Sequence, residues 1–327
     1  MRRRDWLVAV ALALALVAGA CGGDSPNAPG GGAELSGTVK LDGSSTVAPL
    51  SEAAAETFQA ENSGVRVTVG TSGTGGGFEK FCNGDIDIAD ASRAIEDDEK
   101  AACASKGIGF DEFQVANDGL SVVVNKDNSW VDCVTVAQLK AIWDKDSKVK
   151  SWKDVDPKFP AEELKLFGAG TDSGTFDFFT KAINGEEGRS RTDYNATEDD
   201  NVTVQGVSGT KGGLGYFGLS YYEQNKDKLK VLKVDGGDGC VAPSRDTVQS
   251  ADYKPLSRPL FIYPSAKALA RAEVEAFVEF YIENSTDIAE QALFVPLTTA
   301  QQDQLKDQLA KLKAGAGPTE TTTTTSG

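Results

Sequence analysis

The chain has 327 residues, of which 40% are hydrophobic, and a formal net charge of −16. This acidic balance argues against a nucleic-acid partner, because proteins that bind nucleic acid need a basic surface. The sequence contains no histidine, which excludes hydrolases that use a histidine as general base and zinc sites that require one.

The N-terminal residues predict export. Arg2-Arg3-Arg4 precedes an apolar run, Trp6–Ala18, which is too short to span a bilayer and has the order of a secretory signal. We expect residues 1–20 to be a signal peptide. The run ends at Cys21 in a sequence that resembles a bacterial lipobox, so Cys21 is expected to carry a lipid that anchors the protein to a bacterial membrane; plain cleavage is the alternative. Residues 21–36 are expected to form a flexible tether.

Downstream, hydrophobic spacing predicts strands that alternate with helices. Val39 and Leu41 alternate as a strand, and residues 50–58 have helical spacing until Asn62-Ser-Gly64. The following segments are a strand over 65–69, a helix over 78–83, a strand over 86–88, a strand over 164–167 and helices over 176–183, 274–282 and 305–312. This order predicts the α/β class.

Three segments rich in glycine and hydroxyl groups each lie between a predicted strand and a predicted helix. They are residues 43–46, 70–77 and 168–175. Open α/β sheets bind ligands beyond the carboxyl ends of their strands, and the unpaired N–H groups of a helix N-terminus suit a small oxyanion. One anion held between converging helices would explain all three loops. An ordinary helix cap is the alternative for any single one.

Four cysteines follow Cys21, an even number in an exported protein, and their spacing matches no zinc site. Two disulfides are therefore expected. Of three possible connectivities, we favour Cys82–Cys103, which closes a short local loop, and, by elimination, Cys133–Cys240.

Four motifs occur in the order and rough spacing of the PstS family. They are Asp42-Gly-Ser-Ser-Thr-Val-Ala-Pro49, Thr71-Ser-Gly-Thr-Gly-Gly-Gly-Phe78, Asp87-Ile-Ala-Asp-Ala-Ser-Arg93 and Gly170-Thr-Asp-Ser-Gly-Thr-Phe176. From Gly37 to Ala314 the sequence is similar to these phosphate-binding proteins of bacterial phosphate ABC importers. Residues 191–201 and 212–218 resemble the branch that contains the cyanobacterial SphX proteins.

The resemblance implies a two-lobed type II periplasmic-binding-protein fold, with a mixed sheet flanked by helices in each lobe and the ligand in the interlobe cleft. Lobe 1 would comprise residues 37–117 and 258–315, and lobe 2 residues 118–257; residues 316–327 would be a disordered Thr-rich tail. The implied ligand is inorganic phosphate, and the implied partners are the permease subunits of an ABC importer. We expect a periplasmic or cell-surface monomer without enzymatic activity, cofactor or metal.

Carried over by motif, the family's ligand contacts fall on hydroxyl and backbone donors of the three loops. These are Ser45, Thr46, Ser72, Thr74, Ser173, Gly174 and Thr175, with Ser44 and Ser92 as further candidates. The enterobacterial pattern has an aspartate where this chain has Arg93, and an arginine where it has Thr171-Asp172. We expect Arg93 to supply the guanidinium, which suits phosphate as a bidentate donor. A surface ion pair is the alternative.

The lost aspartate leaves open which carboxylate accepts the hydrogen of monoprotonated phosphate, which sulfate lacks. The candidates are Asp90, Asp172, Asp199 and Asp200, with Asn201 as a further polar contact. Each aspartate is equally explained as a solvated charge at the start of a helix. A receptor for sulfate or another tetrahedral oxyanion therefore stays an alternative.

Enzyme motifs fail at specific positions. Thr171 stands where a nucleophile elbow requires glycine, residues 70–77 lack the lysine of a P-loop, and Phe78 stands where a dinucleotide-binding loop ends in glycine. A secreted metal-dependent phosphohydrolase using Asp85, Asp87 and Asp90 is the remaining enzymatic alternative. A purely adhesive surface lipoprotein is the third.

Overall fold

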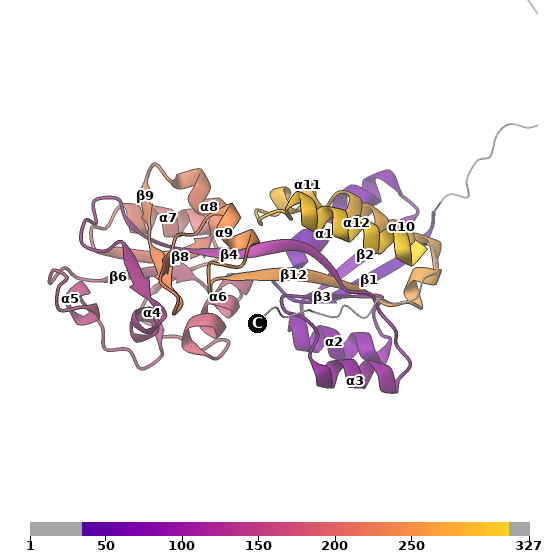
Figure 1. The fold of residues 1–327 in the computed structure, drawn as a ribbon, viewed down its shortest axis with the longest axis horizontal. Helices are drawn as coiled ribbons and strands as arrows, with labels where there is room; N and C mark the ends of the chain where they lie inside the picture. Colours follow the sequence, from indigo (N-terminus) through magenta and orange to yellow (C-terminus); the bar gives the residue numbers. More distant parts are fainter. Residues whose placement is uncertain (1–34, 314–327) are drawn as a thin grey trace, which may run out of the picture. The chain divides into compact units, whose positions relative to one another are not determined.

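A computed structural model describes residues 35–313 of the chain (Figure 1). The predicted signal peptide, Cys21, residues 21–34 of the predicted tether and the predicted tail lie outside the described residues. Within residues 35–313, no helix has both the length and the apolar composition that crossing a membrane requires.

The first lobe, as we name it here, combines three parallel strands with helices from both ends of the chain. The strands are β1 (Gly37–Gly43), β2 (Val65–Gly70) and β3 (Ile88–Ala91). The helices are α1 (Ala48–Glu61), α2 (Gly73–Asn83), α3 (Asp97–Ser105), the 3-10 helix η2 (Ala268–Ala270), α10 (Ala272–Glu283), α11 (Ser285–Gln291) and α12 (Thr299–Lys313). Helices α1 and α10 to α12 cover one face of these strands, and α2 and α3 cover the other (Figure 1).

The second lobe contains the middle of the chain. Its strands are β5 (Cys133–Thr135), β6 (Lys165–Ala169), β7 (Asn195–Thr197), β8 (Gly213–Gly218), β9 (Leu229–Val231), β10 (Lys233–Asp235) and β11 (Cys240–Val241). Its helices are α4 (Val136–Trp143), α5 (Trp152–Val155), α6 (Gly174–Phe179), the π-helix η1 (Thr180–Asn184), α7 (Asp200–Ser208), α8 (Leu219–Asn225) and α9 (Arg245–Gln249).

Two antiparallel strands, β4 (Phe113–Asn125) and β12 (Ser257–Pro264), connect the lobes (Figure 1). β4 pairs with β12 over residues 113–119 and then with β8 over residues 120–124. In the described residues this makes one nine-stranded sheet, in the order β2-β1-β3-β12-β4-β8-β6-β7, with β9 beside β4.

The lobes have separate hydrophobic cores. In the first, Phe58 of α1 meets Phe277 of α10 edge to face at 5.3 Å. In the second, Phe179 stacks on Tyr216 at 3.8 Å, and Trp143 packs edge-on against Tyr216. Each such buried aromatic side chain contributes about 1.5–3 kcal/mol, so each lobe holds its part of any site between them on a rigid support.

The strand and helix order agrees with the sequence prediction, but several boundaries differ, two of them close to the loops. Helix α2 begins at Gly73, five residues before the predicted start, and β3 begins at Ile88 rather than at Ile86. The second glycine segment is therefore the first turn of a helix. Gly77 permits this, because a Cβ there would lie 2.5 Å from the Cα of Gly43 on β1; only glycine lets α2 pack so closely.

Both favoured cysteine pairings are present in the structure. Cys82–Cys103 joins α2 to α3, and Cys133–Cys240 joins β5 to β11 across 107 residues of sequence. Each bridge lies within one lobe, so neither restrains movement of one lobe against the other.

Candidate ligand-binding site

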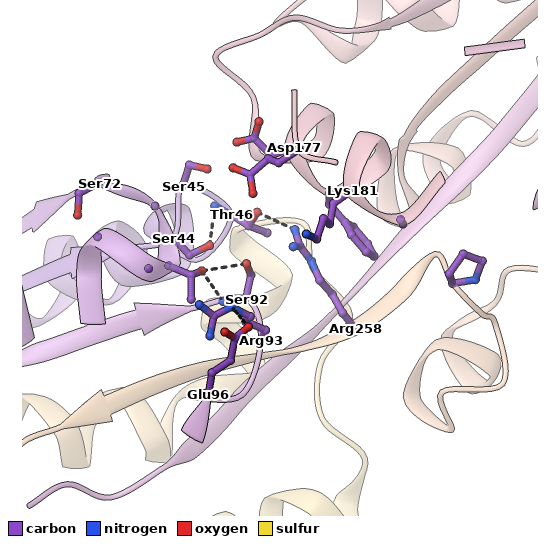
Figure 2. A pocket seen from close by; sticks show the side chains of 18 of the residues that line it. Ser44, Ser45, Thr46, Ser72, Ser92, Arg93, Glu96, Asp177, Lys181 and Arg258 are labelled. Atoms are coloured by element: carbon purple, nitrogen blue, oxygen red, sulfur yellow. Dashed lines mark hydrogen bonds and ion pairs between the residues drawn. The ribbon is translucent and has the colours of Figure 1, made fainter. Parts of the chain in front are cut away.

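A cavity of about 770 Å³ lies between the lobes, at the carboxyl ends of β1, β2 and β3 and beside the crossing strand β12 (Figure 2). Its volume is within the range of about 300–1,000 Å³ that ligand pockets occupy. The first lobe contributes Ser44, Ser45, Thr46, Ser72, Gly73, Thr74, Gly75, Gly76, Ser92, Arg93 and Glu96. The remaining lining residues are Asp177, Phe178, Lys181, Ala182, Glu187, Pro255, Ser257 and Arg258.

The loop between β1 and α1 places three predicted residues on the wall. Ser44 and Thr46 are buried, 3% and 7% exposed. The Ser44 N–H donates to the Asp90 carbonyl at 2.8 Å, and the Thr46 N–H donates to Ser44 Oγ at 3.2 Å, which fixes the loop. Ser45 makes no hydrogen bond through its hydroxyl or N–H within residues 35–313, so it offers two donors to a ligand.

The loop between β2 and α2 is held by Asp42. Asp42 Oδ1 accepts the Ser72 N–H at 2.9 Å and the Ser72 hydroxyl at 2.8 Å, and Oδ2 accepts from Lys80 at 2.5 Å. Thr74 Oγ1 accepts the Ser92 N–H at 3.2 Å. These bonds fix the position of the first turn of α2, whose N–H groups lack partners within the helix and favour an anion.

The loop between β6 and α6 approaches from the second lobe. Ser173 caps α6 by accepting the Thr175 N–H at 3.2 Å. Gly174 meets the first loop, where Thr46 Oγ1 lies 3.4 Å from the Gly174 carbonyl. Ser173, Gly174 and Thr175 are not among the residues that line the cavity, but they lie where the first and third loops converge.

Arg93 lines the cavity and is already ion-paired. Its two terminal nitrogens donate to both oxygens of Glu99 at 2.7 and 2.8 Å, and Nε lies 3.3 Å from Glu96. The Glu99 carboxylate raises the pKa of Arg93 further. The ion pair that we named as the alternative explanation is thus present, and most of the guanidinium's donors are occupied.

Arg258, on the connecting strand β12, was not predicted from the sequence. Its NH2 donates to Thr46 Oγ1 at 2.8 Å (Figure 2). Its Nε lies 3.2 Å from Asp118 on β4. Its guanidinium lies 3.8 Å from the centroid of the Phe178 ring. Its place in the segment where the chain returns from the second lobe to the first is the sequence signal that could have identified it.

Asp177, Lys181 and Glu187 were also missed, and all three line the cavity from the second lobe. Figure 2 shows Asp177 and Lys181. Burial, reinforced by the nearby Glu187 carboxylate, raises the pKa of Asp177 to about 6. Asp177 therefore changes charge close to neutral pH. Acidic groups face this cavity as well as basic ones, so its affinity for anions depends on pH.

The aspartates proposed as hydrogen-bond acceptors are not at the cavity wall. Asp90 is fully buried in the core. Asp199 caps α7 by accepting the Asn201 N–H at 2.9 Å. Asp172, Asp200 and Asn201 are likewise absent from the lining. Burial raises the pKa of Asp200 to about 6, with Asp199 adding to this effect.

The model of the PBP superfamily domain matches residues 28–285 of this chain. This chain belongs to the PBP superfamily. Protein SphX of Synechococcus elongatus is 51% identical over 79% of this chain and 77% of its own length. The phosphate-binding protein PstS of Staphylococcus saprophyticus is 44% identical over 95% and 97%. The superfamily fold is two-lobed, as the described residues are.

A solved structure shows the same arrangement. It is described as a possible phosphate-binding protein from Planctomyces limnophilus, and it is 47% identical to this chain with a TM-score of 0.82. The likeness covers 85% of this chain and 99% of that one. The two-lobed α/β fold predicted from the four motifs is confirmed.

Proposed function

We propose that this chain is an extracytoplasmic receptor that captures inorganic phosphate and delivers it to the permease subunits of a membrane ABC importer. The observation that carries the proposal is the interlobe cavity, where two hydroxyl-rich loops and a buried guanidinium meet. The name of the 44% identical relative, a phosphate-binding protein PstS, supports phosphate as the ligand.

In this proposal, neutral donors supply most of the contacts to phosphate. They come from Ser45, Thr46 and Thr74 of the first lobe, with Ser44 and Ser92 beside them, and from Ser173, Gly174 and Thr175 of the second. Ser72 lines the cavity, but Asp42 accepts both its N–H and its hydroxyl. Arg93 adds a positive charge at the wall. Hydrogen bonds to a charged group contribute about 1.5–3 kcal/mol each, so several together offset the desolvation of the anion. Donors from both lobes act together only when the lobes close, so the ligand shifts the protein toward a closed state.

The rest of the chain fits a tethered receptor. We propose lobe boundaries at residues 37–117 with 258–315 and at 118–257, a lipid on Cys21 and a flexible tether over residues 21–36. Such a receptor acts as a monomer without enzymatic activity. Its flexible tether lets it move near the membrane to which it is anchored.

Calorimetric titration with phosphate and then with sulfate tests this function. The full chain is expressed, and the exported protein is purified and dialysed exhaustively against phosphate-free buffer. We expect saturable binding of one phosphate and weaker binding of sulfate. No heat of phosphate binding at millimolar concentration would contradict the proposal. A preference for sulfate would favour the other-oxyanion receptor, and turnover of a chromogenic phosphoester with added metal would favour the phosphohydrolase.

The affinity for sulfate is expected to rise as the pH falls. Asp177 gains a proton as the pH passes down through its raised pKa of about 6, which removes a negative charge from the cavity, whereas sulfate keeps its charge. Between pH 7.5 and pH 5.5 we expect the affinity for sulfate to rise about three- to tenfold. It is measured by competition with phosphate, after the affinity for phosphate has been determined at each pH. Asp177→Asn should show the stronger competition at both pH values, and an unchanged pH profile in this variant would exclude Asp177 as its source.

A further inference from the structure

Among the cationic side chains that line the described cavity, Arg258 alone lies on a strand that connects the two lobes. It lies on β12, directly opposite Asp118 on β4 in the antiparallel register, so both residues belong to the strands that connect the lobes. The Arg258 side chain is 17% exposed and the Asp118 side chain is 6% exposed. A nearly buried ion pair therefore stands at the back of the cavity.

Three contacts orient this guanidinium. Asp118 accepts from Nε, Thr46 of the first lobe accepts from NH2, and Phe178 of the second lobe stacks on its face. One side chain thus touches both lobes. Stacking uses the face of the guanidinium and leaves its edge free, and among residues 35–313 no acceptor is found for NH1. An arginine carries five N–H donors, so Arg258 has donors left for a ligand.

The charge of Arg258 is preserved despite burial. Burial lowers its pKa, and Asp118 opposes that shift; because an arginine starts from a very high pKa, the guanidinium stays protonated at neutral pH. In a partly desolvated site, the attraction between this charge and an anion is several times stronger than at the surface. Asp118 in turn compensates the charge while the cavity holds no anion.

The other two cations of the cavity are less suited to this role. Arg93 has its terminal nitrogens bound to both oxygens of Glu99, and Lys181 carries an ammonium group on a flexible stem, without the planar fork that fits two oxygens of one anion. Neither touches both lobes in the described contacts. Arg258 combines free donors, fixed orientation and contacts on both sides.

We propose that Arg258 is the guanidinium that binds the tetrahedral anion, and that it couples anion binding to lobe closure because it contacts the first loop and α6 together. Asp118 and Phe178 act as positioning residues for it. This inference rests on the proposed function, and it replaces Arg93 as the main charged contact of the anion.

The test compares Arg258→Gln and Arg258→Lys in the exported full chain, with Arg245→Gln as the matched control. Arg245 is an exposed arginine that pairs with Glu223 and Glu290 away from the cavity. We expect Arg258→Gln to weaken phosphate binding about 30-fold or more, and Arg258→Lys to recover part of this loss by restoring the charge alone. Arg245→Gln should bind phosphate like the unaltered protein.

Small-angle scattering with and without phosphate measures closure. The unaltered protein should become more compact at saturating phosphate, and Arg258→Gln should change less at equal occupancy. Because Arg258→Gln leaves Asp118 buried without its partner, the double variant Asp118→Asn/Arg258→Gln is also measured; it removes the unpaired charge and should still bind weakly.

The outcomes separate the two proposals. If the unaltered protein does not bind phosphate, the proposed function fails. If it does bind, and Arg258→Gln or the folded double variant binds within threefold of it, the role of Arg258 is overturned while the receptor function stands. A loss in Arg93→Gln that exceeds the loss in Arg258→Gln would equally overturn it.

Discussion

Gly174→Ala is expected to weaken phosphate binding about 10- to 100-fold without lowering the stability of the protein. A Cβ at residue 174 would lie 2.5 Å from Thr46 Oγ1 and 2.8 Å from the Thr46 nitrogen, closer than real Cβ contacts. Overpacking of this kind costs about 1–3 kcal/mol, and the lobes can relieve it by moving apart. The cost therefore falls on the closed, ligand-binding state.

The stability of the lobe itself should stay the same or rise. Gly174 begins α6, where alanine is as acceptable as glycine and reduces the freedom of the unfolded chain, which stabilises by about 0.4–1 kcal/mol. Calorimetric titration gives the affinity, and denaturant unfolding gives the free energy of unfolding. Gly174→Val, with a larger side chain, should remove measurable binding.

Gly218→Ala is the matched control for this glycine. It lies in the same lobe at the end of β8, and a Cβ there would meet nothing within 4 Å. We expect this variant to bind phosphate normally. Normal binding by Gly174→Ala as well would show that the approach of Gly174 to Thr46 is not needed for the bound state.

The parts of the fold that were predictable depend on local sequence. Alternation in β1 and the helical spacing in α1 act over a few residues, and each hydroxyl-rich loop is recognisable because its glycines and serines stand next to each other. The pairing of Cys82 with Cys103 was also local. The start of α2 was missed because four glycines in one turn oppose helix formation; here the tight packing of Gly77 on Gly43 overrides that preference.

The charged part of the site could not be derived in the same way. Arg258 meets Asp118 across 140 residues of sequence, and only the register of β12 on β4 brings them together. Arg93 was chosen because a motif places it near the ligand, but a motif does not show that Glu99, in the first turn of α3, occupies its donors. The hydroxyl donors of the site can be recognised from the local composition of the loops. Which charged side chains are paired, and which are free to bind a ligand, depends on tertiary contacts.

Asp90→Asn is expected to stabilise the protein at alkaline pH, because the Asp90 carboxyl group is fully buried. Asp90 lies on β3 with 0% exposure, and within residues 35–313 its carboxyl oxygens make no hydrogen bond of ordinary geometry, although the Ser51 hydroxyl lies close enough to favour the ionised form. Burial, with smaller contributions from Asp42 and Glu52, raises the pKa of Asp90 from 3.8 to about 8. At neutral pH this side chain is therefore protonated in the folded protein and ionised in the unfolded chain.

The direction of the pH dependence follows from that difference. Between about pH 4 and pH 8 the folded state binds one more proton than the unfolded state, so the free energy of unfolding falls as the pH rises through this window. Integrated over the window, the loss is on the order of 5–6 kcal/mol. Asparagine at this position does not titrate, so the variant should lose this part of the pH dependence.

Guanidinium unfolding at pH 5, 7 and 8.5 measures the effect. At pH 5 we expect Asp90→Asn to be more stable than the unaltered protein by about 1–2 kcal/mol, because the Asp90 carboxyl is already ionised in the unfolded chain; at pH 8.5 this difference should grow to several kcal/mol. Asp238→Asn, at an exposed position, removes the same charge as a control and should follow the unaltered protein. Since the Asp90 carbonyl accepts the Ser44 N–H of the first loop, phosphate titration of the variant also shows whether the buried acid influences the site. Parallel pH curves for Asp90→Asn and the unaltered protein would mean that Asp90 does not carry this proton.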